Sequence, residues 1–304
     1  MSASVFIDGA AGTTGLEIRE RLAGRTDLDL VTLGEDKRKD AAARRDAINA
    51  ADVVILCLPD DAAREAVALI DNARTRVIDA SSAHRVADGW TYGFPELGFD
   101  VAGAARVSNP GCYPTGFLAL VAPLVRAGLL AADTPLAVHG TSGYSGGGKA
   151  MIAEFESGAG SAHRAYALGL GHKHVPEMTQ HAGLSVAPIF MPSVADIHRG
   201  MVIEVPLHAA HLAPGTTPDR VHAALADAYA NAPLVRVATD SAALIRIEDD
   251  AGTDRMTLHA FGSADASQFR LVATLDNLGK GASGAAVQNL NIMIGADPLT
   301  GLGH

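Results

Sequence analysis

The sequence predicts an α/β chain in which a doubly wound parallel sheet is followed by an α+β domain with a mixed, mostly antiparallel sheet. In the first third of the chain, short apolar segments alternate with helical ones, which is typical of a parallel sheet. Further on, longer β-like segments follow one another with few helices between them, which favours antiparallel pairing. The chain has 304 residues, 48% of them hydrophobic, which is enough for two cores.

The first sheet is expected to contain four strands, each followed by a turn or a helix. These strands are residues 4–8, 28–33, 53–58 and 76–79. Helical periodicity predicts helices at residues 16–23, 41–50 and 62–72. The third strand is apolar almost throughout, as a strand buried on both faces should be, and Cys57 within it is expected to be an inert core thiol.

The second part of the chain is expected to be richer in strands. A helical run at residues 116–125 is followed by β-like stretches at residues 136–140, 203–208, 234–237, 256–261 and 270–275. Only one clear amphipathic helix, residues 218–229, is expected to interrupt them. The expected domains are residues 1–111, residues 112–276, and residues 277–304, whose helix at 284–293 returns to the first domain.

Composition excludes several classes of function. The formal net charge of −10 argues against a nucleic-acid surface and favours small-molecule partners. No apolar run is long enough to span a bilayer and no signal peptide is recognised, so no membrane association is expected. Two cysteines are too few for a disulfide framework, which predicts a cytoplasmic location.

A glycine turn directly follows the first expected strand and opens the first helix. Glycines let a backbone approach a pyrophosphate, and a helix N-terminus supplies N–H donors, so this turn predicts a Rossmann-type nucleotide site. Its spacing, Gly-x-x-Gly-x-x-Gly, differs from the commoner fingerprint, and glycine used only for packing is the alternative. The residues expected to contact the cofactor here are Gly9, Ala11, Gly12, Thr13, Thr14 and Gly15.

The end of the second strand bears on which nucleotide is bound. Carboxylates there favour NAD, whereas cations favour the 2′-phosphate of NADP. Glu35 and Asp36 are followed at once by Lys37, Arg38 and Lys39, so the signal is mixed, and a solvated charged turn is the alternative. We favour NADP(H), with Lys37 and Arg38 as its ligands.

Cys112 lies between two prolines in the run Asn109-Pro110-Gly111-Cys112-Tyr113-Pro114 and just ahead of an apolar helical run. A thiol at a helix N-terminus should ionise below its free pKa of about 8.5, because unpaired N–H groups and the helix dipole favour an anion. Cys112 is therefore a candidate nucleophile. An inert buried thiol is the alternative.

A nucleophilic cysteine needs a proton-transfer partner, and residues 171–177 supply candidates within one turn or short strand. His172 is the main candidate, with His174 and Glu177 as further acid–base or substrate-binding groups. A metal site is the rival interpretation of His-x-His, but no third ligand lies nearby, so no metal is expected. A solvated polar loop also remains open.

Two further segments offer groups that could bind an anionic substrate. Arg85 follows the carboxyl end of the fourth strand, where parallel sheets bind ligands. Residues 142–149 form an expected flexible loop rich in donors, including Ser142, Gly143 and Lys149. Surface turns are the alternative for both segments, and a salt bridge is the alternative for Arg85.

Taken together these motifs resemble the N-acetyl-γ-glutamyl-phosphate reductase family, in particular its shorter sequence type. The resemblance covers nearly the whole chain and rests most specifically on Asn-Pro-Gly-Cys-Tyr-Pro-Thr at 109–115 and His-Lys-His-x-Pro-Glu at 172–177. It also includes the glycine turn, Asp79 to Arg85, Tyr92 to Leu97 and Asn277 to Asn291.

The resemblance implies NADPH-dependent reduction of N-acetyl-glutamyl 5-phosphate to the 5-semialdehyde and phosphate, in arginine biosynthesis. Cys112 matches the nucleophile that forms a thioester, and His172 matches the acid–base histidine. It implies further cofactor contacts at Leu58, Pro59, Ser81, Asn277 and Lys280, and substrate contacts at Arg85, Asn109, Ser142, Gly143 and Lys149. It also implies a homodimer or homotetramer.

Two alternatives to this activity remain. A related enzyme could act on another acyl phosphate, such as aspartyl or aminoadipyl phosphate, since substrate choice depends on loop contacts. A non-catalytic NADP-binding redox sensor would use Cys112 only as an oxidisable thiol.

Overall fold

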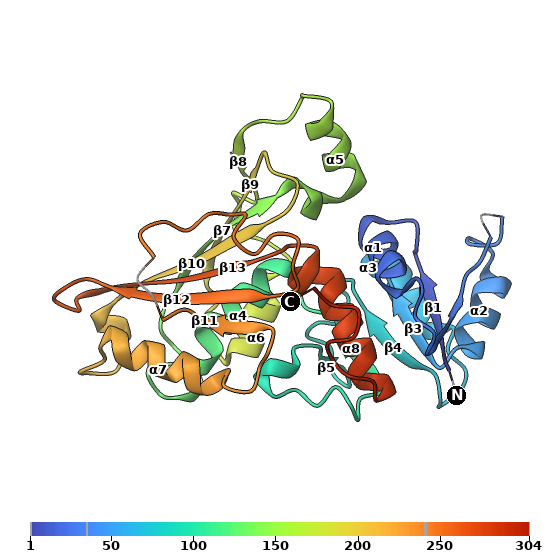
Figure 1. The fold of residues 1–304 in the computed structure, drawn as a ribbon, viewed down its shortest axis with the longest axis horizontal. Coiled ribbons are helices and arrows are strands. Elements are labelled where there is room, and N and C mark those ends of the chain that lie inside the picture. The colour runs from blue at the N-terminus through green and yellow to red at the C-terminus, as the bar shows by residue number, and fades with distance from the viewer. Residues whose placement is uncertain (1, 35, 240–241, 304) are drawn as a thin grey trace. The chain divides into compact units, whose positions relative to one another are not determined.

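The structure is a computed structural model that describes residues 2–34, 36–239 and 242–303. The chain divides into two compact units (Figure 1). Unit 1 contains the chain up to Gly111 together with Ala282–Leu302, and unit 2 contains Cys112–Gly281 with Gly303. Among the described residues, no helix is both long and apolar enough to cross a membrane.

Unit 1 is built on a six-stranded sheet with the strand order β2-β1-β3-β4-β6-β5. Every neighbouring pair in it is parallel, which confirms the predicted parallel sheet. The strands are β1 (Ala3–Asp8), β2 (Leu28–Val31), β3 (Val53–Leu56), β4 (Arg76–Asp79), β5 (Thr91–Tyr92) and β6 (Arg106–Ser108). The last two were not predicted, because strands of two or three residues carry no periodicity.

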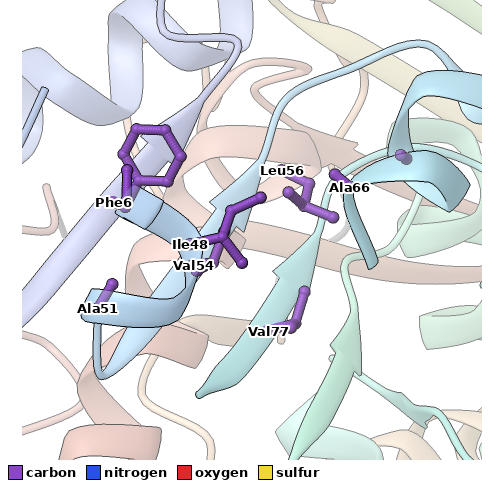
Figure 2. Close-up of a cluster of buried hydrophobic side chains, with 9 residues drawn as sticks. Phe6, Ile48, Ala51, Val54, Leu56, Ala66 and Val77 are labelled. Carbon is purple, nitrogen blue, oxygen red and sulfur yellow. The ribbon is translucent and has the colours of Figure 1, made fainter. Parts of the chain in front are cut away.

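Helices and apolar strands form the core of unit 1. The helices are α1 (Thr13–Leu22), α2 (Ala41–Ala50), α3 (Asp60–Ala68) and α8 (Gly284–Ile294). Figure 2 shows Phe6 of β1, Ile48 of α2 and Val54 of β3 in one buried cluster, and burial of such a side chain contributes about 1.5–3 kcal/mol. Helix α2 has its predicted bounds, and Asp40 caps it by accepting a hydrogen bond from the Ala43 N–H.

The prediction that Cys57 lies inside the third strand is wrong. Strand β3 ends at Leu56, and Cys57 begins the turn that leads to α3. The residue as a whole is partly buried, and its thiol is buried. The pKa of Cys57 is raised to about 12, mainly by this burial and in addition by the carboxylates of Asp79 and Asp8. Cys57 is therefore an unreactive thiol, as predicted, but for electrostatic reasons as well as burial.

Unit 2 is built on a seven-stranded sheet with the order β11-β12-β13-β10-β7-β9-β8. Two neighbouring pairs, β11–β12 and β7–β9, are parallel and the others are antiparallel, which confirms the predicted mixed sheet. Its strands are β7 (Ala137–Gly143), β8 (His163–Ala165), β9 (Ile189–Ala195), β10 (Met201–His208), β11 (Val235–Val237), β12 (Met256–Gly262) and β13 (Gln268–Leu275).

One face of this sheet is covered by α4 (Cys112–Arg126), which packs on β10, β12 and β13 and contacts α6 (Val175–Ala182) and α7 (Pro218–Ala228) (Figure 1). Gly116 permits the close approach, because a Cβ there would lie 2.6 Å from the Ile203 side chain. Along β10, buried residues alternate with more exposed ones, so the opposite face of the sheet is open.

The expectation of a single amphipathic helix between the strands is wrong. Both α5 (Gly148–Glu156) and α6 interrupt the strand-rich sequence. Each is short, and α5 begins within a run of glycines that is typical of a loop. Strands β8 and β9 were also missed.

Candidate active site

The glycine turn of unit 1 has the geometry of a phosphate cradle. Gly9 has φ of +88°, and a Cβ there would lie 2.3 Å from the Cys57 carbonyl oxygen, while a Cβ on Gly15 would lie 2.5 Å from the Gly9 oxygen. Helix α1 starts after Gly12 without a side-chain cap. Among the described residues, the buried Oγ1 of Thr13 has no hydrogen-bond partner, which fits a turn that receives oxygens from a ligand.

Further predicted cofactor residues of unit 1 lie after β2 and β3. Leu58 lies against Gly9, and Pro59 precedes α3 as its N-cap residue. Lys37 and Arg38 are exposed in a turn after β2, where both backbone N–H groups donate to the Gly34 oxygen. Glu35, the first residue of the predicted charged turn, lies outside the described residues.

The loop after β4 is organised by the buried carboxylate of Asp79. It accepts hydrogen bonds from the backbone N–H and the hydroxyl of Ser81, and it lies 2.6 Å from Nδ1 of His84. The ring of His84 stacks on Trp90 at a centroid distance of 4.1 Å. This loop therefore holds Ser81, a predicted cofactor residue, through its own backbone and hydroxyl.

Arg85 and Asn109, both predicted to bind substrate, are bonded to one another in unit 1. The Arg85 Nε donates to the backbone oxygen of Asn109, and the Asn109 side chain donates to Ala282 and accepts from Asn289. Asn109 thus fixes the backbone three residues before Cys112. Its role toward the substrate stays a prediction, as does that of Arg85.

Cys112 is the first residue of α4, as the sequence predicted for a thiol at a helix N-terminus. The first turn of α4 contains no acidic residue that would compete with a thiolate for the helix dipole. The turn Gly279–Ser283, which is π-helical, passes directly beside it, because a Cβ on Gly281 would lie 2.8 Å from the Cys112 Cβ.

Two tyrosines that the sequence did not single out lie beside the cysteine. Tyr166 donates to the Tyr113 hydroxyl at 3.2 Å, and Tyr113 donates to the Ser193 carbonyl oxygen at 2.9 Å. Burial raises the pKa of Tyr113 well above its usual value and that of Tyr166 to about 12, and the negative charge of Cys112 also raises both. Both hydroxyls are therefore neutral donors at physiological pH.

Residues 171–177 as a whole form neither a single turn nor a short strand, the two forms that the sequence predicted for them. His172 and Lys173 lie in a turn, His174 is the N-cap residue of α6, and Glu177 lies in the first turn of that helix. The His172 ring lies 6.3 Å from the ring of Tyr113 and 5.8 Å from that of Tyr166, measured between centroids. The structure therefore brings His172 into the aromatic surroundings of Cys112.

His174 and Glu177 are more deeply buried than His172. The Nε2 of His174 lies 4.0 Å from the Glu177 carboxylate, which is only 1% exposed. Among the described residues, no group of three or more histidine, cysteine or carboxylate side chains is arranged to hold a metal ion.

The predicted flexible loop at residues 142–149 is instead ordered secondary structure. Ser142 and Gly143 end β7, Tyr144–Gly147 form a 3₁₀ turn, and Lys149 is an exposed residue of α5. The backbone N–H of Gly143 donates to the Gly200 oxygen, and a Cβ on Gly143 would lie 2.7 Å from the His198 oxygen. Packing of this segment against residues 197–200 is the physical reason that it is not mobile.

Asn277 and Lys280, predicted to bind cofactor, lie in unit 2 and are buried. The Asn277 side chain accepts a hydrogen bond from the Gly200 N–H and donates one to the Ser145 hydroxyl. It therefore connects its own segment with the turn before β10 and with the 3₁₀ turn after β7. Arg199, which the sequence did not single out, lies in this cluster 3.7 Å from Asp276. The neighbouring Gly200 has φ of +116°, and no motif in the sequence indicated this turn.

A parallel nucleotide-type sheet joined to a mixed sheet that carries a cysteine at a helix start is the architecture of semialdehyde dehydrogenases. Residues 37–105 match the family model described as semialdehyde dehydrogenase, NAD binding domain, and residues 112–277 match the model described as semialdehyde dehydrogenase, dimerisation domain. The aspartate semialdehyde dehydrogenase II of Vibrio cholerae superposes with a TM-score of 0.74 at 17% identity, covering 97% of this chain and 98% of that one. The aspartate semialdehyde dehydrogenase of Francisella tularensis superposes with a TM-score of 0.74 at 13% identity, covering 96% of this chain and 100% of that one.

Sequence similarity narrows the class. The chain is 51% identical over 308 residues to the N-acetyl-γ-glutamyl-phosphate reductase of Sinorhizobium fredii, covering 97% of this chain and all of that protein. It is 52% identical over 305 residues to the N-acetyl-γ-glutamyl-phosphate reductase of Burkholderia orbicola, covering 96% of this chain and 97% of that protein. The chain belongs to the N-acetyl-γ-glutamyl-phosphate reductase family.

Proposed function

We propose that the chain reduces N-acetyl-L-glutamyl 5-phosphate to N-acetyl-L-glutamate 5-semialdehyde and phosphate, with NADPH as the reductant, in arginine biosynthesis. The observation that carries the proposal is the placement of Cys112 at the start of α4, beside Tyr113 and Tyr166 and near His172, in a member of this reductase family. The proposal includes a cytoplasmic location, where a nucleophilic thiol stays reduced.

In the first half of the reaction, the Cys112 thiolate attacks the acyl carbon of the substrate. The new C–S bond replaces the bond from that carbon to the phosphate oxygen, and phosphate leaves with the electron pair, so a thioester remains on Cys112. Because phosphate is a good leaving group, the helix N-terminus supplies sufficient activation of the thiol.

In the second half, the nicotinamide cofactor when bound supplies a hydride to the thioester carbon. The resulting thiohemiacetal oxyanion reforms its carbonyl and expels the Cys112 thiolate, which releases the aldehyde. In the proposed reaction His172 stabilises the oxygen in both tetrahedral species, and its position beside Tyr113 and Tyr166 supports this role. The neutral hydroxyls of Tyr113 and Tyr166 keep the surroundings free of additional negative charge.

The residues of unit 1 fit a dinucleotide. The Gly9–Gly15 turn and the partnerless Thr13 hydroxyl suit the pyrophosphate, and the exposed Lys37 and Arg38 suit a 2′-phosphate. Asn277 and Lys280 remain proposed contacts on the other unit, and Arg199 joins Arg85 and Lys149 as a proposed cation for the substrate anions.

A phosphate-dependent assay in the oxidative direction tests substrate, cofactor and acyl-phosphate chemistry together. N-acetyl-glutamate semialdehyde is supplied with NADP and then with NAD, with and without inorganic phosphate. We expect nucleotide reduction that requires phosphate and proceeds faster with NADP. Faster turnover of aspartate semialdehyde or an aminoadipyl analogue would contradict the proposed substrate, and the absence of any turnover would favour a redox sensor.

We propose in addition that the chain forms a homodimer, or a homotetramer that contains this dimer, through the open face of the unit 2 sheet. That face carries a groove of about 810 Å³ whose lining includes the apolar side chains of Ile189 and Phe261 and the Glu204–Arg270 ion pair. Residues 112–277 match a family model described as a dimerisation domain, and an exposed apolar face on that unit is typical of an interface between subunits. Ile189→Glu should shift the mass in light scattering to that of a monomer, whereas Leu244→Glu, which is outside the sheet and also exposed, should not.

A further inference from the structure

Strand β1 ends in Asp8, a buried carboxylate that directly precedes the glycine turn. Arg44, in the first half of α2, donates to Oδ2 of Asp8 from Nη2 at 2.8 Å and from Nε at 3.1 Å. We propose that Arg44 neutralises Asp8 so that the anionic cofactor can bind beside it. Arg44 is then a positioning residue that acts on NADP(H) through Asp8 and is not one of its ligands. This inference rests on the proposed function.

The carboxylate of Asp8 lies in an apolar setting. The three residues before it in β1, Val5, Phe6 and Ile7, are buried, and the Asp8 side chain itself is only 6% exposed. A buried carboxylate is screened little by water or salt, so its charge acts over a longer range than a charge on the surface. The thiol of Cys57 feels this charge, because Asp8 contributes to its raised pKa.

The charge of Asp8 lies at the edge of the sheet where an anion is expected to bind. Gly9, the next residue, opens the glycine turn, and parallel sheets bind ligands at the carboxyl ends of their strands. Strand β4 also ends in a buried aspartate, Asp79, whose carboxylate lies 2.6 Å from Nδ1 of His84. Two buried carboxylates thus lie at the edge that would receive the phosphates of the cofactor, and either of them would repel phosphates if it lost its basic partner.

The geometry of the ion pair favours an action of Arg44 through Asp8. Two nitrogen atoms of the guanidinium, Nε and Nη2, donate to the same carboxylate oxygen, and the Arg44 side chain is only 15% exposed. The side of the guanidinium that these two atoms form is therefore occupied by Asp8. Lys37 and Arg38, in contrast, are exposed in the turn that leads to α2, which suits direct contact with a phosphate.

The next residue of α2, Arg45, supplies a matched control. Consecutive residues of a helix project about 100° apart, so Arg45 lies on a different side of α2 from Arg44. It pairs with Asp71 at 2.9 Å on the surface, where both side chains are more than half exposed. Arg45→Met therefore removes the same group from the same helix without leaving a buried carboxylate unpaired.

Titration of the full-length protein with NADPH, followed by the fluorescence of the nucleotide, tests the proposal without any substrate. We expect Arg44→Met to weaken NADPH binding by roughly tenfold or more, because it leaves the Asp8 charge uncompensated beside the phosphates. Arg45→Met should change the dissociation constant by less than about threefold. Circular dichroism at the assay temperature checks that each variant is folded. Equal effects of the two variants would overturn the proposal.

Removal of the second charge distinguishes neutralisation from direct contact. The double variant Asp8→Asn/Arg44→Met leaves no charge uncompensated, so it should bind NADPH within about threefold of wild type. If the double variant instead binds as weakly as Arg44→Met, Arg44 contacts the cofactor itself and the proposal is wrong. Asp8→Asn alone keeps the cation and should tighten binding by roughly threefold. Unchanged or weaker binding by Asp8→Asn would also contradict the proposal, and this variant decides the question if Arg44→Met does not fold.

An uncharged ligand distinguishes electrostatic repulsion from a displaced glycine turn. Adenosine carries no phosphate, so Arg44→Met should weaken its binding, measured by competition with NADPH, by less than about threefold. Equal losses for adenosine and NADPH would show that the mutation displaces the turn, and would overturn the neutralising role of Arg44. If the wild-type protein did not bind NADPH at all, the proposed cofactor would be wrong, so the two failures are distinguishable.

Discussion

Cys57 and Cys112 each come shortly after the carboxyl end of a strand of the parallel sheet, β3 and β6 respectively; Cys57 precedes α3, and Cys112 is the first residue of α4. Burial and the carboxylates of Asp79 and Asp8 raise the pKa of the Cys57 thiol to about 12. Helix α3, which follows Cys57, carries Asp60 and Asp61 in its first turn, whereas the first turn of α4 has no acidic residue. The charges around the two thiols therefore differ, which agrees with an inert role for Cys57 and with the nucleophilic role proposed for Cys112.

Replacement of each thiol by a hydroxyl should give the largest difference between the two sites. Cys112→Ser should lower kcat by at least roughly 10³-fold, because a serine hydroxyl without an adjacent base is a poor nucleophile. Cys57→Ser should keep kcat within about threefold of wild type, since the mutation leaves the nucleophile intact. The phosphate-dependent oxidation of the semialdehyde measures both, and nucleotide binding by fluorescence checks that each variant folds. Substantial turnover by Cys112→Ser would refute the thioester route.

Alkylation should separate the two thiols without any mutation. At pH 8, a thiol with a pKa of about 12 is ionised to roughly one part in 10⁴, so iodoacetamide should modify Cys57 at least a hundredfold more slowly than Cys112. Because the pKa of Cys57 is raised, its protonated form favours folding below pH 9, and this contribution is lost as pH rises toward 12. Mass spectrometry of the labelled peptides gives the two rates. In denaturant they should become similar, and similar rates in the native protein would contradict the comparison.

The sequence predicted the two sheets and the position of Cys112 because each rests on a local pattern. Alternating apolar segments identified β1, β3 and β4, and Pro110 and Gly111 marked the start of α4. It did not predict α5, because this helix begins at Gly148, the last of three consecutive glycines that are typical of a loop. The contacts of Gly143 with residues 197–200 order that segment, and such long-range packing has no local signature.

The same distinction holds within the site. Cys112 and His172 lie in recognisable motifs, whereas Tyr166 and Arg199 have no motif around them. Tyr166 reaches Tyr113 through the pairing of β8 with β9, and Arg199 reaches Asp276 from the turn before β10. Of the causes that raise the pKa of Cys57, only burial was predictable from the sequence. The approach of Asp8 and Asp79 was not, because it depends on the register of neighbouring parallel strands.

Each cysteine also lies against a glycine, and alanine at the two glycines should have different consequences. A Cβ at position 281 would lie 2.8 Å from the Cys112 Cβ, so Gly281→Ala should displace the nucleophile and lower kcat by roughly tenfold or more. A Cβ at position 9 would lie 2.3 Å from the Cys57 oxygen, at φ of +88°, so Gly9→Ala should instead destabilise unit 1 by about 1–3 kcal/mol and weaken NADP binding.

Gly12→Ala is the matched control for the stability loss of the second variant alone, since its Cβ would meet its nearest neighbour at an ordinary 3.5 Å but Gly12 belongs to the same proposed cofactor turn. Thermal unfolding and NADP titration, read beside kcat, distinguish the effects. If Gly281→Ala lost stability but retained full kcat, the close approach of this turn would have no part in placing the thiol.

The smallest expected effect concerns the acidic first turn of α3. Asp60 accepts hydrogen bonds from the Ser82 N–H at 3.0 Å and from its hydroxyl at 2.8 Å, and it complements the helix dipole. Asp60→Ala should therefore lower the free energy of unfolding by about 1–2 kcal/mol, and Asp60→Asn, which keeps an acceptor, by less. Alkylation of Cys57 should stay as slow as in wild type, because its pKa is raised by burial, Asp79 and Asp8 and not by Asp60. A marked acceleration in Asp60→Asn would show instead that the acidic first turn, and not the pair at the strand ends, is what distinguishes Cys57 from Cys112.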